Sequence, residues 1–152
     1  MSDRLYPEGI DCVWVASDRN GHLGAFITAG VGPIPDKALD VSYMPLESIE
    51  SRICDMPKGS EVRLLVSVKR PDDFIALAER GVFVFDWTDI GRTSRDAVHA
   101  YEPVASPVKP IKVDMVPADI ATLANALKFV DVDFTEEKLL DVRVHASCRE
   151  CN

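Results

Sequence analysis

The segment His145-x-x-Cys148-x-x-Cys151 carries the side chains best suited to binding a metal ion. Cysteine and histidine are the usual ligands of zinc, and a two-residue gap lets two thiolates reach one ion. A structural zinc site needs four ligands, so Cys12 or Cys54 would have to supply the fourth. A redox pair is another alternative, although no helix N-terminus that would lower a thiol pKa is predicted here. Since one Cys-x-x-Cys pair is weak evidence, we expect exposed thiols and no cofactor, and keep zinc as the alternative.

A second candidate group is Asp86-Trp87-Thr88-Asp89, which follows a predicted strand. Loops at strand ends are favoured positions for functional side chains. Paired carboxylates could bind a metal or perform acid–base chemistry, so one hypothesis is a small enzyme with a carboxylate site near Asp86 and Asp89. A tryptophan beside two acids also suits a protein-binding site, because aromatic side chains anchor interfaces. The structural alternative is a buried Trp87 whose neighbouring carboxylates cap a turn.

Two further polar patterns fall short of a catalytic or nucleotide-binding motif. His22 lies close to Asp18 in the sequence and could act as a general base, but no G-x-S-x-G pattern supplies a nucleophile. Gly30-Val-Gly32 is followed by proline at position 35, where a dinucleotide-binding fingerprint needs its third glycine. We therefore predict an exposed polar turn at the first position and a rigid loop at the second.

Acidic residues are concentrated between positions 114 and 141. This stretch holds seven carboxylates and two lysines, a net charge of −5 out of −8 for the chain. Around 130–134 acids alternate with apolar residues, which predicts a strand face that presents several carboxylates together. Such a field attracts a basic partner and speeds its docking, and the alternative is a solvated surface. The acids are Asp114, Asp119, Asp131, Asp133, Glu136, Glu137 and Asp141.

The elements that must position these groups begin with a β-hairpin. Two apolar, β-prone runs at 11–17 and 22–29 flank Asn20-Gly21, a strong hairpin signal because both turn residues tolerate positive φ. Both faces of the first run are apolar. The hairpin is therefore expected inside a sheet rather than at its edge.

Helices and further strands follow from periodicity and from proline and glycine positions. Helices are predicted from Pro45 to about residue 56, at 71–80 and from Pro117 to about Phe129, since apolar residues recur at helical spacing in each. Strands are predicted at 62–68 and 82–86. Two more, at 101–105 and 111–115, are expected at sheet edges because prolines flank them.

Strands outnumber helices without regular alternation, which favours an α+β fold with a mixed or mainly antiparallel sheet and about three helices packed on it. The chain of 152 residues suits one domain. We place this domain at 1–146 and expect a flexible C-terminal tail at 147–152.

Composition excludes some classes of function. The net charge of −8 argues against a duplex nucleic-acid binder, which needs a cationic face, and against a protein held on a membrane by charge. The apolar runs are too short to span a bilayer, and the N-terminal residues lack the features of a secretory signal. We therefore expect a cytoplasmic protein.

The function favoured by the sequence is a non-catalytic protein-binding module. It is similar in size and charge to immunity proteins and other inhibitors that cover a basic partner with an acidic face. The alternatives are the small enzyme and the zinc protein described above. No nucleic acid or membrane is expected as a partner. The predicted partner-binding residues are Asp86, Trp87, Asp89, Asp131, Asp133, Glu136 and Glu137.

Overall fold

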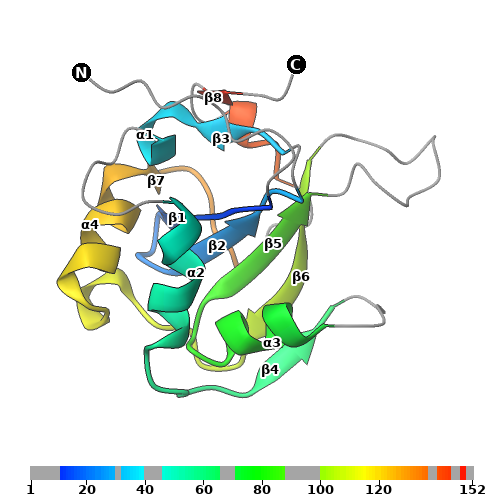
Figure 1. Ribbon diagram of the computed structural model, residues 1–152, viewed down its shortest axis with the longest axis vertical. Coiled ribbons are helices and arrows are strands. Elements are labelled where there is room, and N and C mark those ends of the chain that lie inside the picture. The colour runs from blue at the N-terminus through cyan, green and yellow to red at the C-terminus, as the bar shows by residue number, and fades with distance from the viewer. Residues whose placement is uncertain are drawn as a thin grey trace.

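A mixed six-stranded sheet, in the order β4-β6-β5-β2-β1-β7, lies at the centre of this computed structural model (Figure 1). The structure describes residues 11–29, 32–39, 46–65, 71–87, 100–136, 140–144 and 148–149. Within these ranges the predicted α+β fold with a mixed sheet is confirmed. The strands of this sheet are β1 (Val13–Asp18), β2 (Leu23–Ile27), β4 (Val62–Leu64), β5 (Phe83–Trp87), β6 (Tyr101–Pro107) and β7 (Lys128–Phe129).

The helices pack their apolar stripes against the sheet, and α2 and α3 lie in front of its strands in Figure 1. In α2 the predicted stripe is confirmed, since Ile49 and Ile53 are buried. None of the helices in the described ranges is long and apolar enough to cross a membrane. The helices are α1 (Asp36–Leu39), α2 (Leu46–Cys54), α3 (Asp72–Ala78) and α4 (Ala118–Ala126), with short 3-10 helices at Val113–Met115 and Val142–Val144.

The predicted hairpin is confirmed and is interior to the sheet. β1 pairs antiparallel with β2, and Gly21 in the connecting turn has a φ of 82°, which glycine adopts without steric cost. β2 also pairs in parallel with β5, and β1 pairs in parallel with β7. Both hairpin strands are buried along their whole length, as the apolar faces of the first run indicated.

Aromatic rings line one face of the sheet. The Trp14 and Phe26 rings stack with centroids 4.2 Å apart, and Phe26 stacks on Phe85 at 4.8 Å. Phe129 and Phe134, from the segment that follows α4, meet Phe26 edge-on. These offset and edge-on contacts stabilise beyond simple burial, and they attach the segment after α4 to the sheet.

Several local predictions were wrong. α4 ends at Ala126, before the predicted end near Phe129, because Lys128 and Phe129 pair with β1 as β7. β6 lies between β4 and β5 rather than at an edge. The sheet accommodates Pro103 at a register shift between β5 and β6, and Pro107 at the end of β6 that does not pair with β5. Residues 113–115 form a 3-10 helix, and the segment 130–134 is not a strand, because pairing with β1 ends at Phe129.

A second, two-stranded sheet joins β3 (Ile34–Pro35) to β8 (Cys148–Arg149) in antiparallel pairing. The other residues of the predicted tail at 147–152 lie outside the described ranges. The domain boundary at 146 stays a prediction.

Candidate functional site

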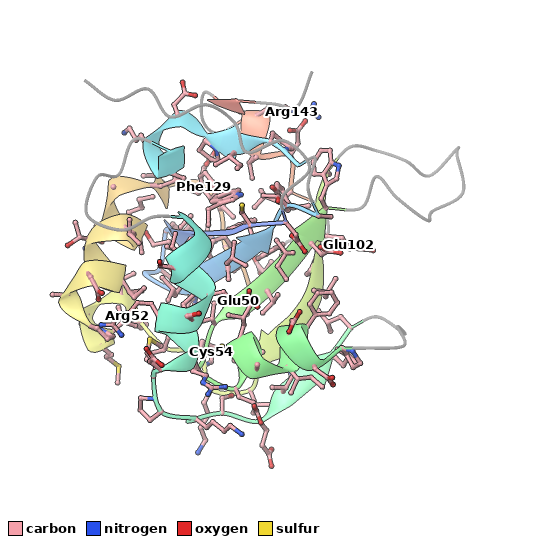
Figure 2. The ribbon with its side chains drawn as sticks, in the orientation of Figure 1. Glu50, Arg52, Cys54, Glu102, Phe129 and Arg143 are labelled. Atoms are coloured by element: carbon pink, nitrogen blue, oxygen red, sulfur yellow. The ribbon has the colours of Figure 1, made fainter. Side chains whose placement is uncertain are left out.

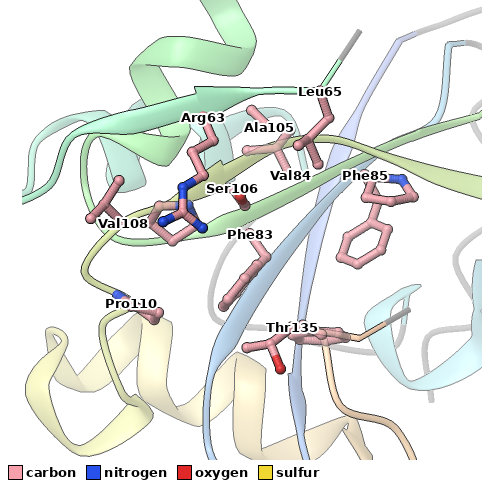
Figure 3. Close-up of a pocket in the computed structure, with 13 residues that line it drawn as sticks. Arg63, Leu65, Phe83, Val84, Phe85, Ala105, Ser106, Val108, Pro110 and Thr135 are labelled. Atoms are coloured by element: carbon pink, nitrogen blue, oxygen red, sulfur yellow. The ribbon is translucent and has the colours of Figure 1, made fainter. Parts of the chain in front are cut away.

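A groove of about 370 Å³ lies over β4, β5 and β6 (Figure 3). Its floor is apolar and comes from Phe83 and Phe85, which β5 presents at alternate positions on one face. Phe134 and Thr135 form the opposite wall. The groove falls in the volume range of ligand pockets, most of which are apolar with a few polar groups at fixed positions.

Arg63 is the charged side chain of the groove. It projects from β4 toward Val108 and Pro110 (Figure 3). In the described ranges it forms no ion pair, whereas Arg52 and Arg143 each hold a carboxylate at 2.8 Å. An exposed, unmatched guanidinium beside an apolar floor is a suitable partner for an anionic group.

Exposed apolar side chains lie at the same groove and on the opposite face of β4. Leu64, Leu65 and Val108 are 40%, 49% and 40% exposed. Leu65 and Val108 line the groove itself, and Leu64 is adjacent in β4. Scattered exposed leucines are ordinary, but their concentration beside an apolar groove indicates an interaction surface.

Behind the groove, a buried carboxylate holds its wall in place. Asp18 is fully buried, and its Oδ1 accepts the backbone N–H groups of Asn20 and His22, each at 2.9 Å. Its Oδ2 accepts the N–H of Phe134 at 2.9 Å and lies 3.1 Å from Nδ1 of His22. A buried carboxylate with this many donors is a structural anchor. The predicted turn is therefore present, but Asp18 is not exposed as expected.

His22 and Asp133 complete a cluster around Asp18. The His22 ring lies 5.5 Å from that of Phe83 in the groove floor. Asp133 accepts the N–H and O–H of Thr135, and these hydrogen bonds hold the pKa of its carboxyl below the usual value. Ligand atoms of Asp18, His22 and Asp133 lie within 4.8 Å of one another, so they could hold a cation. Because Asp18 accepts three backbone N–H groups and Oδ1 of Asp133 accepts both donors of Thr135, we interpret the cluster as a structural support for Phe134 and Thr135.

Among the described residues, four acids of the stretch 114–141 lie within 4.0 Å of an arginine of this chain. Asp119 pairs with Arg52 at 2.8 Å and Asp141 with Arg143 at 2.8 Å. Arg19 lies 3.8 Å from Asp133 and 4.0 Å from Glu136. These pairs weaken the negative electrostatic field that the net charge of −5 in this stretch predicts.

Three acids outside that stretch are close enough to repel one another. Burial raises the pKa of Glu50 above its usual value, and the charges of Asp73 and Asp11 raise it further. Burial and Asp73 also raise the pKa of Asp11. Glu50 extends from α2 (Figure 2). We call Asp11, Glu50 and Asp73 the carboxylate cluster.

Of the predicted binding residues around Trp87, the structure describes Asp86 and Trp87, and neither is exposed. The Trp87 side chain is 6% exposed and packs edge-on against Tyr101 with centroids 5.2 Å apart. Asp86 is half-buried, whereas Asp131 and Glu136 are exposed. Asp89 and Glu137 lie outside the described residues, so an enzyme site near Asp86 and Asp89 stays a prediction.

The zinc hypothesis also stays a prediction. His145 and Cys151 lie outside the described ranges, and Cys148 is described only through the backbone of β8. Of the two proposed fourth ligands, Cys12 is buried at the start of β1. Burial raises the pKa of the Cys54 thiol, which disfavours the thiolate that zinc requires. Elemental analysis of purified protein tests this hypothesis directly.

Comparisons with known proteins find no match, whether with a protein-family model, a curated protein or a solved structure.

Proposed function

We propose that this protein is a non-catalytic protein-binding module, related in kind to inhibitors and immunity proteins, that docks its partner on the groove and the β4 edge. The observation that carries the proposal is the concentration of exposed apolar side chains around a groove with an unmatched arginine. Such a surface gains stability when a partner removes it from water.

The state of the titratable groups also supports binding over catalysis. In the part of the chain that the structure describes, Asp18 with His22 resembles a catalytic dyad, but it fixes the hairpin turn and the backbone of Phe134. Its carboxylate is fully buried behind the groove wall. A general base must reach the proton that it removes, and a carboxylate in this position supports the wall instead.

The test is affinity capture from the native host with matched valine variants. Val108 borders the groove, and Val130 is equally apolar and 72% exposed elsewhere. We expect Val108→Asp to lose the captured partner, because it places a charge in the apolar surface, while Val130→Asp keeps it. Equal capture by both variants and by the wild type would contradict docking at the groove.

A basic partner, as expected from the sequence, could instead bind this protein at a second surface, the carboxylate cluster. These acids repel one another, and the described residues give them no ion pair, so a cationic partner would stabilise their charged form. Binding there should weaken steeply between about 0.1 M and about 1 M salt, where the Debye length falls from about 10 Å to about 3 Å. Loss of capture in Glu50→Lys with retention in Val108→Asp would favour this surface over the groove.

A further inference from the structure

We propose that the groove receives an extended acidic segment of the partner, which adds to β4 as a new edge strand and places a carboxylate against Arg63. The inference rests on the proposed function, since it names how the partner binds at that surface.

The backbone of β4 is oriented to accept a strand. The N–H of Leu65 donates to Val104 O, and Glu61 O accepts from the N–H of Val108, both at 2.9 Å. Residues 61, 63 and 65 therefore direct their backbone groups toward β6. Because these directions alternate along a strand, the N–H and C=O groups of Val62 and Leu64 point away from β6. Within the described ranges no strand lies on that outer side of β4.

The side chains at this edge fit an apolar strand. Arg63 and Leu65 share one face of β4 and line the groove, while Leu64 projects from the other face. An added strand would cover Leu64 with one set of alternate side chains and reach the groove with the other. A small molecule in the groove would leave Leu64 uncovered, so the exposed apolar residues favour a peptide chain as the occupant.

Charge specifies the partner further. Arg63 and Lys109 are both exposed at this end of β4 and β6, and neither forms an ion pair in the described ranges. A guanidinium binds a carboxylate in a bidentate, charge-assisted arrangement. A second copy of this chain would bring the same two cations and the single acid Glu61 to this edge, so the edge would meet a net positive charge like its own. An acidic segment of a different protein is therefore the occupant that the charges favour.

The probe is a displayed library of random peptides, selected on the full chain. We expect enriched peptides that alternate apolar residues and carry an aspartate or glutamate, with affinity reduced about tenfold or more by Arg63→Glu. Lys128→Glu is the matched control, since it makes the same charge change on β7, at the opposite edge of the sheet. Enriched peptides without an acid, or equal effects of the two variants, would overturn the inference.

Amide hydrogen exchange then tests strand addition itself. A bound peptide should protect the N–H groups of Val62 and Leu64, which point outward, and leave that of Arg63 nearly unchanged because it already faces β6. Protection elsewhere, or a dimer whose formation buries the same two amides, would overturn it. Because partner capture by the Val108 and Val130 variants does not depend on peptide selection, failure of the inference is distinguishable from failure of the proposed function.

Discussion

The Asp18 carboxylate accepts the backbone N–H of Phe134 at 2.9 Å, across 116 residues of sequence. This hydrogen bond joins the tip of the first hairpin to the wall of the groove. The proposed interaction surface is therefore supported by a buried polar contact rather than by loop residues alone, and its shape should depend on residues that a ligand never touches.

Replacement of Asp18 should destabilise the fold. Asp18→Asn removes the buried charge and turns an acceptor into a donor opposite backbone N–H groups. We expect a loss of about 2–4 kcal/mol in the free energy of unfolding, measured by urea denaturation. Asp114→Asn, at an exposed position, should change it by less than about 0.5 kcal/mol. Similar effects of both variants would show that Asp18 is not an anchor.

Replacement of Gly24, which lies against the Phe134 ring, should change both stability and binding. A Cβ on Gly24 would lie 2.7 Å from the Phe134 ring, so Gly24→Ala must displace that ring. We expect a cost of about 1–3 kcal/mol and weaker partner capture, because Phe134 is part of the groove wall. Gly59→Ala is the control, since a Cβ there meets no atom within 4 Å. Wild-type capture by Gly24→Ala would contradict a role for the wall.

Tyr101 and Trp14 should be energetically coupled in the core. The Tyr101 hydroxyl accepts the Trp14 Nε1–H at 3.2 Å and donates to Pro33 O at 2.9 Å. Tyr101→Phe leaves both groups buried without this partner and should cost about 1–3 kcal/mol. A double-mutant cycle with Trp14→Phe should give a coupling of about 0.5 kcal/mol or more. Additive effects would show that the hydrogen bond contributes nothing.

The carboxylate cluster predicts a pH dependence. The pKa of Glu50 is higher in the folded chain than its ordinary 4.5, so the folded chain holds the proton over a wider pH range. This group therefore lowers stability as pH rises from 4.5 through the raised pKa, and its penalty is complete at neutral pH. Glu50→Gln should raise the urea midpoint at pH 7 and lose that advantage below pH about 4. Glu61→Gln, at an exposed position, is the comparison, and a midpoint change of equal size in it would argue against burial and the neighbouring acids of Glu50 as the cause.

Sequence patterns recovered the elements that local chemistry determines. The hairpin follows from two apolar runs around Asn20-Gly21, and the end of α3 from Gly81, whose φ is 92°. The interior position of β6 could not be predicted from its prolines, because proline disfavours an interior strand only where its missing N–H would be needed. The register shift at Pro103 and the end of pairing with β5 before Pro107 depend on the tertiary fold, not on the local sequence.

The candidate site was largely missed for the same reason. The sequence places Asp18 and His22 in a polar turn, but the burial of Asp18 depends on Phe134, far along the chain. The groove is lined by residues of β4, β5, β6 and the segment after β7. No local sequence pattern indicates that these segments lie together. One signal was available: Val62-Arg-Leu-Leu65 places a single cation within a short apolar strand.

The pairing of β1 with β7 has a consequence for folding during synthesis. β1 and β2 can form their hairpin early, but the second neighbour of β1 and the Phe134 N–H that satisfies Asp18 are more than a hundred residues away. At ordinary translation rates they leave the ribosome on the order of ten seconds later. Until then the hairpin has an open edge and an incompletely bonded carboxylate. Any fragment that ends before residue 128 keeps that state permanently, so truncation there should yield an aggregating chain rather than a smaller domain.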